Sequence, residues 1–250
     1  MDQRYLILEK LLLKALKMGF SVINKVEIIE SNTKDPLINL KEEKELFESS
    51  LNGKIILRFW VNAPSVIIGK FQKEEYEVNL PLAKSLNIQI LRRLSGGGAV
   101  YHDEGVLNIT IVKEKELKLF SSYIIDETRY LTSLISEVIE KETHESTIIN
   151  ERNGIFVKGK KVAGSSVAVS KNFLYHISVL VNADLNILNK ILQGRPYEAN
   201  EKRFVKSIKS EVTNLKELNP SISIESFKNH VKEHLAKNLH LKIQQITSSF

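Results

Sequence analysis

The sequence contains no cysteine in its 250 residues, and this absence excludes several kinds of chemistry. Disulfide bonds, thiolate metal sites and thioester intermediates on the protein all need a cysteine sulfur. Aromatic residues make up only 7% of the chain, and there are 11 glycines and 5 prolines. With 42% hydrophobic and 26% charged residues, the composition is that of an ordinary folded protein and not of a disordered one.

The sequence also lacks a hydrophobic run long enough to cross a membrane. The most apolar N-terminal stretch, residues 6–16, is interrupted by Glu9, Lys10 and Lys14, which is unlike a spanning helix or a signal peptide. We therefore expect a cytoplasmic protein with no membrane partner. The net charge of +6 permits binding to nucleic acid, to nucleotide phosphates or to an acidic protein, and solvated lysines on helix faces also explain it.

Hydrophobic periodicity predicts helices and strands that do not alternate regularly. The expected helices span residues 1–20, 39–48, 78–86, 123–142, 185–192 and 224–238, with Asp184 as the N-cap of the fifth. The expected strands span residues 26–29, 55–61, 65–68, 88–93, 99–101, 107–112, 148–149, 155–157, 161–170, 174–181 and 241–246. This order favours an α+β fold with mixed, largely antiparallel sheets flanked by helices over a doubly wound parallel sheet.

A run of three glycines, Gly96 to Gly98, lies between two expected strands and directly follows Arg92 and Arg93. Backbone amides without a neighbouring Cβ bind anions well, and a guanidinium offers a planar fork to phosphate or carboxylate. The run is neither a phosphate loop nor a dinucleotide fingerprint, because the required spacings are missing. A β-bulge or tight hairpin also explains the glycines, but the arginines and the nearby His102 favour an anion site.

A second stretch, "VKGKKVAGSSVAV", places Lys161 on an expected strand after a turn at Gly159. A lysine in such a pattern is usually an edge residue with its ammonium in water. Together with the arginine and glycine stretch, the alternative is a cation held against an anionic ligand.

The two stretches, in this order, resemble the lipoate-protein ligase family. Arg92 to Asn108 follow the family pattern Arg-Arg-x-Ser-Gly-Gly-Gly-Ala-Val-Tyr/Phe-His-Asp-x-Gly-Asn-Leu-Asn, with Val106 in place of the first Asn, and Gly159 to Ser165 follow its Gly-x-Lys-Val/Ile-Ala/Ser-Gly-Ser. Weaker matches are "INLKEEKELF", "WVNAPSVIIGKFQ", "HISVLVNADLNILNKIL" and "KSIKSEVTNLKEL". The combination of ordered blocks is specific, whereas any single block is not.

The resemblance covers about residues 22–240 and implies a catalytic domain related to class II aminoacyl-tRNA synthetases and biotin ligases. We expect residues 1–21 to form an N-terminal helical extension and residues 22–250 to form this domain. The implied reaction converts lipoate and ATP to lipoyl-AMP and then transfers the lipoyl group to a lysine of a lipoyl domain. The implied acceptors are E2 subunits of 2-oxoacid dehydrogenases and the H protein of glycine cleavage.

Carried over residue by residue, the resemblance makes Lys161 the catalytic residue, in contact with the lipoyl carboxyl oxygen and the α-phosphate. Residues expected to bind nucleotide or lipoyl-AMP are Arg93, Ser95, Gly96, Gly97, Gly98, Ala99, Val100, Tyr101, His102, Asn108, Lys161, Gly164, Ser165 and His176. Magnesium is expected with the ATP phosphates, with Asn153 as a nearby candidate. Fixed cations suit this reaction, because two anions must be brought together.

The sequence departs from the family pattern at several places. Gly154 stands where the family has an aspartate near the metal and phosphates, and Ile177 replaces the glycine of the family's His-Gly-Thr, which we expect to alter the acyl tunnel. The chain ends at Phe250, close to the expected end of the large domain. We therefore expect the family's C-terminal accessory domain to be absent and to come from a separate protein that supports adenylation.

Four other functions are alternatives to a lipoate-protein ligase. A transferase that works through a cysteine thioester is excluded by composition, and the Gly-Arg-Gly-Arg loop of biotin ligases is not found. A non-catalytic relative that binds lipoyl-AMP is the main alternative, because of Gly154. Nucleic-acid binding has only the basic charge in its favour, since no basic stripe with interleaved aromatic residues is present.

Overall fold

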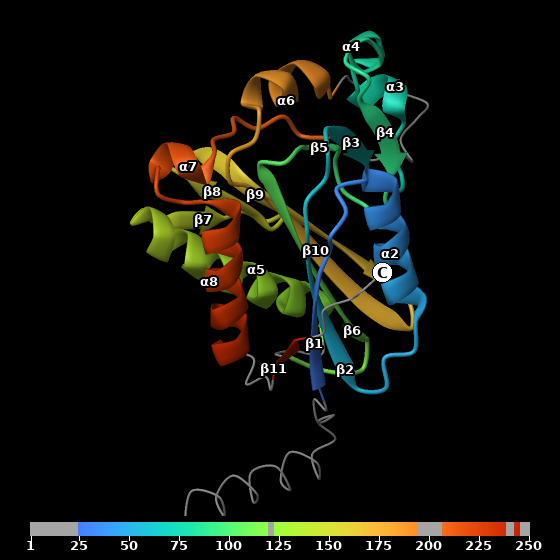
Figure 1. Cartoon of the computed structure of the whole chain (residues 1–250), viewed down its shortest axis with the longest axis vertical. Coiled ribbons are helices and arrows are strands. Elements are labelled where there is room, and N and C mark those ends of the chain that lie inside the picture. The colour runs from blue at the N-terminus through green and yellow to red at the C-terminus, as the bar shows by residue number, and fades with distance from the viewer. Residues whose placement is uncertain (1–24, 120–122, 195–206, 239–242, 246–250) are drawn as a thin grey trace, which may run out of the picture.

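The computed structural model describes residues 25–119, 123–194, 207–238 and 243–245, so the helix expected over residues 1–20 lies outside them. Two β-sheets with helices packed around them make up this part of the chain (Figure 1). The elements in chain order are β1 (Lys25–Glu30), α2 (Pro36–Glu48), β2 (Lys54–Trp60), β3 (Ser65–Ile68), α3 (Glu74–Glu77), α4 (Leu80–Ser85), β4 (Gln89–Arg92), β5 (Val100–His102), β6 (Val106–Glu114), α5 (Ile124–Thr143), β7 (Thr147–Ile149), β8 (Gly154–Val157), β9 (Lys160–Val169), β10 (Asn172–Leu180), α6 (Leu185–Ile191), α7 (Leu215–Leu218), α8 (Ile224–Asn238) and β11 (Ile243–Gln245).

The large sheet has eight strands in the order β11-β1-β2-β6-β10-β9-β8-β7. Its pairs β11–β1 and β1–β2 are parallel, and the pairs from β2 to β7 are antiparallel. A small sheet has the order β4-β3-β5, with one parallel and one antiparallel pair. The predicted α+β class with largely antiparallel sheets is therefore confirmed.

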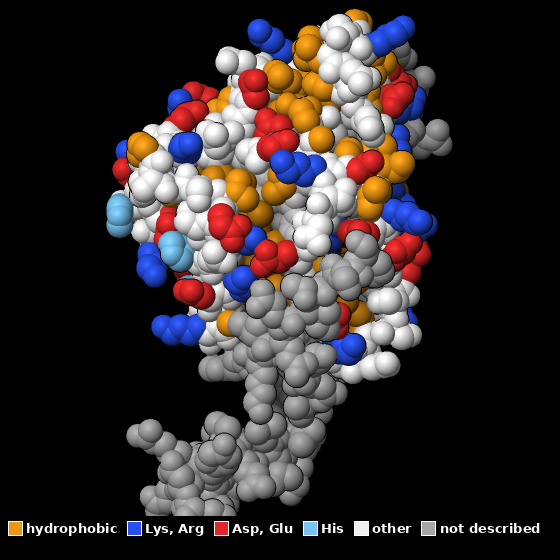
Figure 2. Space-filling view, in the orientation of Figure 1, with side chains coloured by type: hydrophobic (Ala, Val, Ile, Leu, Met, Phe, Trp, Pro, Cys, Tyr) orange, Lys and Arg blue, Asp and Glu red, His pale blue; other side chains and the backbone are white. Residues whose placement is uncertain are grey.

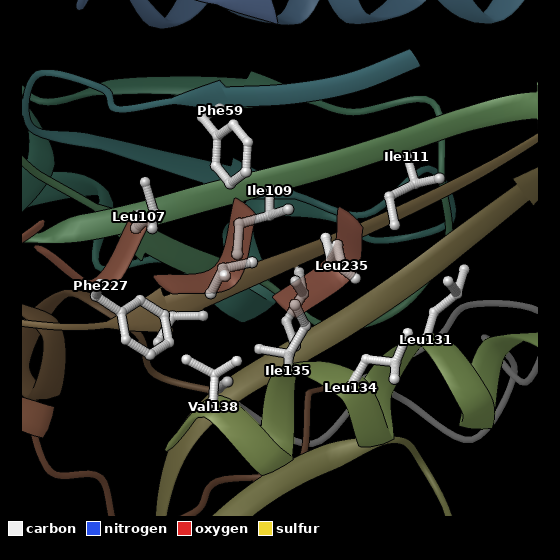
Figure 3. Packing of buried hydrophobic residues seen from close by; sticks show 14 of the residues in the cluster. Phe59, Leu107, Ile109, Ile111, Leu131, Leu134, Ile135, Val138, Phe227 and Leu235 are labelled. Atoms are coloured by element: carbon white, nitrogen blue, oxygen red, sulfur yellow. The ribbon is translucent and has the colours of Figure 1, made fainter. Parts of the chain in front are cut away.

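One face of the large sheet forms the main hydrophobic core. Successive side chains of a strand point to opposite faces, and the odd-numbered residues of β2, β6 and β10 are aliphatic or aromatic, with the exception of Lys113. Figure 3 shows Phe59 of β2 and Leu107, Ile109 and Ile111 of β6 directed toward α5 and α8. Buried members of this cluster include Ile55, Leu57, Phe59, Leu107, Ile109, Ile111, Leu131, Ile135, Val138, Phe173, Tyr175, Ile177, Phe227 and Leu235.

The even-numbered residues of the same strands face α2 and the small sheet, and many of them are polar. The even-numbered residues that carry hydrogen-bonding groups include Arg58 and Trp60 of β2, Asn108 and Thr110 of β6, and His176 and Ser178 of β10. The same pleat that builds the core on one face thus gathers hydrogen-bonding groups on the other.

Helix α2 lies against this polar face and begins three residues before the predicted start. Asp35 caps it by accepting hydrogen bonds from Leu37 N and Ile38 N, and Pro36 occupies its first position. Both residues are standard start signals.

The helix predicted over residues 78–86 is found as the shorter α4, which begins two residues later, and the short helix α3 before it was not predicted. Val78 is extended between the two helices, and the Asn79 side chain caps α4 by accepting from Leu82 N. Asp184 caps α6 as predicted, since its Oδ1 accepts from Ile187 N at 3.0 Å.

Within the described residues, no helix is both long and apolar enough to cross a membrane. Figure 2 shows acidic and basic side chains interspersed on the face seen in Figure 1.

Candidate functional site

The glycine loop, which we define as residues 93–99, connects β4 of the small sheet to β5. Arg93 organises it from inside: Nε donates to Ser95 Oγ at 3.0 Å, Nη1 to Ile67 O at 3.1 Å, and Nη2 to Gly96 O and Gly98 O at 2.5 and 2.8 Å. Four of the five N–H groups of a guanidinium are thus engaged. Burial lowers the pKa of Arg93 to about 10, although the Glu43 carboxylate opposes the shift, so the side chain is charged at neutral pH.

The glycines of the loop are packed by the protein itself. Gly97 has φ of +83°, which an L-residue rarely adopts, and a Cβ there would lie 3.0 Å from Arg93 Nη2. A Cβ at Gly98 would lie 2.9 Å from Ser207 Oγ. The sequence led us to expect that the glycines leave space for a ligand. At Gly97 and Gly98, the position of a Cβ is instead next to the side chains of Arg93 and Ser207.

A chain of hydrogen bonds connects α2 to the loop through His176. Glu43 is fully buried and its carboxylate lies 3.1 Å from His176 Nδ1, while His176 Nε2 lies 2.8 Å from Ser95 Oγ. Burial by itself would raise the pKa of Glu43, but His176, Thr110 and Arg58 together lower it, so the carboxylate is ionised. An ionised carboxylate only accepts hydrogen bonds, so His176 Nδ1 carries a proton.

The order Ser95, His176, Glu43 resembles a catalytic serine triad, yet burial excludes that role. Ser95 has no exposed surface, and its oxygen already accepts from Arg93 Nε. The three residues therefore hold Arg93 and the glycine loop in place.

A second chain of hydrogen bonds ends on an unpartnered amide. Asn62 Nδ2 lies 3.1 Å from His102 Nδ1, His102 Nε2 lies 3.0 Å from Ser178 Oγ, and Ser178 Oγ donates to Asn108 Oδ1 at 2.7 Å. Burial, with Arg93 and His176 nearby, lowers the pKa of His102 to about 3, so its ring is neutral. Asn108 Nδ2 is buried and has no hydrogen-bond partner within the described part of the chain.

Lys161 lies near the start of β9 and extends past two glycines. A Cβ at Gly164 would lie 3.0 Å from Lys161 Nζ, and one at Gly154 would lie 3.3 Å from its Cε. Burial, followed by the charges of Arg93 and Arg152, lowers the pKa of Lys161. Among residues 25–119, 123–194, 207–238 and 243–245, none accepts a hydrogen bond or forms an ion pair with Lys161 Nζ. The ammonium is therefore available to an anion.

These groups line a cavity with two lobes. The polar lobe, of about 380 Å³, is lined by Arg93, His102, Asn108, Arg152 and His176, among others. The apolar lobe, of about 120 Å³, lies toward α6 and is lined in part by Tyr101, Ala163, Leu180, Leu188 and Leu192. Lys161 lines both lobes, so it stands at their junction.

Most residues that the sequence singled out come together at this cavity. Those that line the polar lobe are Arg93, Gly97, Gly98, Ala99, Val100, His102, Asn108, Lys161, Gly164, Ser165 and His176, and Tyr101 lines the apolar lobe. Ser95 and Gly96 line a separate groove on the α2 side of the loop. Asn153 lines neither lobe; its carbonyl accepts from Ser165 Oγ at 3.1 Å.

Sequence reasoning missed several groups that complete the site. Glu43 is 133 residues from its partner His176, and Ser207 is 108 residues from Ala99, so no local spacing connects them. Trp60 and Arg152 also line the polar lobe. For Glu43 the available signal was a glutamate in an otherwise buried position of a predicted helix.

The expectation that Ile177 alters an acyl tunnel is wrong. Ile177 is 1% exposed and belongs to the main core, because odd-numbered residues of β10 point away from the cavity. Gly154, in contrast, does line the polar lobe, next to Lys161.

The described residues contain no group of three or more His, Cys, Asp or Glu side chains arranged to hold a metal ion. Magnesium bound with ATP needs only one or two protein carboxylates, because phosphates and water supply the remaining ligands. Glu151, which lines the polar lobe, is compatible with this use.

Comparison with known proteins identifies the family. Residues 35–236 match the model of the lipoyl protein ligase A/B catalytic domain. The chain is 32% identical to lipoate–protein ligase 1 of Staphylococcus aureus over 80% of this chain and 60% of that protein. It is 31% identical to lipoate-protein ligase A subunit 1 of Thermoplasma acidophilum, over 84% of this chain and 82% of that protein. It is also 31% identical to the human mitochondrial lipoyl amidotransferase LIPT1, over 84% of this chain and 55% of that protein.

Solved structures agree. A bipartite lipoate protein ligase of T. acidophilum, solved with its E2 lipoyl domain, superposes with a TM-score of 0.73 at 27% identity, covering 90% of this chain and 87% of that one. A lipoate-protein ligase A bound with ATP superposes with a TM-score of 0.73 at 25% identity, covering 91% of this chain and 90% of that one. The chain spans about three fifths of the length of the S. aureus ligase. The family model matches residues 35–236, and the similar structures have the same fold. The chain therefore belongs to the lipoyl protein ligase A/B catalytic domain family.

Proposed function

We propose that the chain is the catalytic domain of a lipoate-protein ligase. It activates lipoate with ATP to lipoyl-AMP and pyrophosphate, then transfers the lipoyl group to a lysine of a lipoyl domain. The observation that carries this proposal is the ammonium of Lys161, which lies at the junction of two lobes and has no ion-pair partner among the described residues. A single cation at such a junction can contact both halves of an acyl-adenylate.

The electrostatics of the cavity suit the first step. A carboxylate attacking the α-phosphate meets electrostatic repulsion, and fixed cations offset this and stabilise the charge that develops on the phosphoryl oxygens. Lys161, Arg93 and Arg152 are the cations close to one another in the cavity, as their mutual influence on the pKa of Lys161 indicates. Magnesium, when bound with ATP, would neutralise further phosphate charge, with Glu151 as a candidate protein ligand.

Neutral hydrogen-bonding groups complete the proposed ligand site. The orphaned Asn108 amide offers a donor to a ligand oxygen, and its orientation is fixed by Ser178 and His102. A buried amide donor without a partner costs roughly 1–3 kcal/mol, which a bound ligand would recover. The remaining predicted binding residues line the cavity or, for Ser95 and Gly96, support the loop beside it.

The proposed partners follow from the relatives. The T. acidophilum ligase with 27% identity is described as bi-partite, and its structural study also covers its E2 lipoyl domain. We propose that this chain likewise modifies lipoyl domains, of E2 subunits or the glycine cleavage H protein, and that a separate accessory protein supports adenylation. The cytoplasmic location and the domain boundary at residue 22 stay predictions.

The test measures each half-reaction by the intact mass of an acceptor. Purified chain is incubated with an apo lipoyl domain and either lipoate with magnesium-ATP or preformed lipoyl-AMP, and Lys161→Met serves as the inactive control. Lipoylation from lipoyl-AMP alone supports the transfer step and the need for a partner, and lipoylation from ATP as well shows that no partner is needed. Because one relative is named a lipoyl amidotransferase, a third tube contains a lipoylated protein as donor in place of lipoate and ATP, and a mass gain of the acceptor there alone would indicate a transferase instead of a ligase. No mass gain in any tube would leave only a binding protein and overturn the proposal.

A further inference from the structure

Ser207 connects the glycine loop to the rest of the cavity wall. It begins the strap, which we define as residues 207–213, on the segment between α6 and α7. Its Oγ accepts hydrogen bonds from Ala99 N at 2.9 Å and from Gln72 Nε2 at 3.1 Å, and its own N–H donates to the buried carboxylate of Glu77 at 3.1 Å. Two segments distant from Ser207 in sequence, residues 72–77 and the glycine loop, thus hold this serine in place.

The direction of these hydrogen bonds leaves the hydroxyl hydrogen of Ser207 without an acceptor among the described residues. A hydroxyl has one hydrogen to donate and two lone pairs to accept with. Ala99 N–H and Gln72 Nε2–H are donors only, so they occupy both lone pairs. Within the described ranges, no residue accepts a hydrogen bond from Ser207 Oγ. The O–H bond must therefore point away from the loop.

Ser207 lines both lobes of the cavity, as Lys161 does. The strap is also hydrogen-bonded to the strand of Lys161, because Lys161 N donates to Glu211 O at 2.7 Å and Thr213 N donates to Lys161 O at 3.1 Å. One end of the strap is therefore fixed to Ala99 and the other to Lys161. The hydroxyl and the ammonium are held at the same junction by one short segment.

We propose that Ser207 contacts the ligand directly, by donating its hydroxyl hydrogen to an oxygen of the acyl-phosphate group at the junction of the two lobes. This inference rests on the proposed function, which places that group beside Lys161. It also changes the role of the loop, because the Ala99 amide then acts on the ligand through Ser207. The polarised hydroxyl, which accepts from two N–H groups, is a stronger donor than an isolated one.

A purely structural role for Ser207 makes different predictions. In that case Ser207 only connects the glycine loop to α3 through its hydrogen bonds. Any variant that weakens these hydrogen bonds would then lower the affinity for all ligands by a similar factor. Gln72→Leu removes one donor to Ser207 Oγ but leaves the hydroxyl hydrogen free for the ligand. It also removes the acceptor for Gly69 N, so it is a demanding control for loop support.

The experiment measures affinity by calorimetry for three probes: lipoate, AMP, and lipoyl-sulfamoyl-adenosine, a stable analogue in which a sulfonyl group replaces the phosphoryl group. The proteins are wild type, Ser207→Ala, Ser207→Cys and Gln72→Leu, each checked for folding by its melting temperature. The cysteine variant is nearly isosteric and a weak donor, so it keeps the test valid where the alanine variant fails to fold.

For Ser207→Ala and Ser207→Cys we expect affinity for the analogue to fall roughly tenfold to a hundredfold, the usual effect of losing a hydrogen bond to a charged group. Lipoate affinity should change little in these variants, and Gln72→Leu should bind the analogue better than either. Equal losses for Gln72→Leu and the serine variants, or an unchanged affinity of the serine variants, would overturn this inference alone. If wild type fails to bind the analogue, the proposed function fails, and this inference with it.

Discussion

The two faces of the central sheet share their strands but do different work. On β10, Tyr175 and Val179 belong to the main core, while their neighbours His176 and Ser178 line the cavity. On the core face burial of apolar side chains supplies stability, and this leaves the opposite face free to hold buried polar and charged groups that cost stability. Function on one face of a strand thus depends on stability from the other.

The largest effect on stability is expected from the core face. Phe227 of α8 is fully buried against the sheet (Figure 3), so Phe227→Ala should lower the free energy of unfolding by about 3–5 kcal/mol through lost burial and a cavity. Urea unfolding measures this. At low temperature the activity per folded molecule should stay at the wild-type level, and a large loss of activity there would mean that the two faces are not separable.

On the cavity face the expected effects are reversed. Lys161→Met should reduce lipoylation roughly 10²–10³-fold, on the scale of about 3–4 kcal/mol for one lost charge-stabilising contact. The ammonium is buried near Arg93 and Arg152 and has no partner in the part of the chain that the structure describes. Its removal should therefore leave the free energy of unfolding unchanged or raise it. Single-turnover transfer from lipoyl-AMP and urea unfolding are compared, and a strong destabilisation would show that Lys161 is a structural residue.

The buried histidine of the cavity face predicts a stability loss in acid. Burial lowers the pKa of His102 from 6.5 to about 3, so between these values the unfolded chain binds a proton that the folded chain does not. Stability contributed by neutral His102 is therefore complete above pH 6.5 and falls as the pH drops toward 3, by at most about 1.4 kcal/mol per pH unit. His102→Gln should show a shallower dependence of unfolding free energy on pH between 6 and 4. The same slope in both proteins would contradict this pKa.

Local signals in the sequence predicted much of the fold and part of the site. Most expected strands, the long helix α5 and the Asp184 cap are found where alternation, periodicity and side-chain chemistry placed them. Asp35 and Pro36 are start signals in the sequence that the prediction did not use, and Asn79 caps α4, so that this helix begins two residues later than predicted. These errors concern boundaries, which single residues decide.

Contacts between distant segments could not be predicted from local pattern. The glycine run and Lys161 indicated an anion site, but the partners of Arg93 turned out to be loop carbonyls, and Glu43 and Ser207 reach the site from other elements. The register of β10 decides whether Ile177 faces the core or the cavity, and this register depends on the pairing of β10 with β6 and β9. The sequence therefore indicated the chemistry of the site before its geometry.

The smallest expected effect tests whether the helix that covers the cavity face can be weakened without harming the site. The buried residues of α2 include Asn39 and Glu43, which are polar, so hydrogen bonds and its N-cap stabilise it more than apolar burial does. Asp35→Ala removes the acceptor for Leu37 N and Ile38 N and should cost about 1 kcal/mol of unfolding free energy. The control Asp35→Asn keeps an N-cap oxygen and should cost less.

Transfer from lipoyl-AMP should be unchanged in both Asp35 variants at low temperature, because Glu43 lies two turns inside the helix. A loss of transfer in Asp35→Ala alone would show that the start of α2 sets the position of Glu43 and, through His176, the position of the glycine loop.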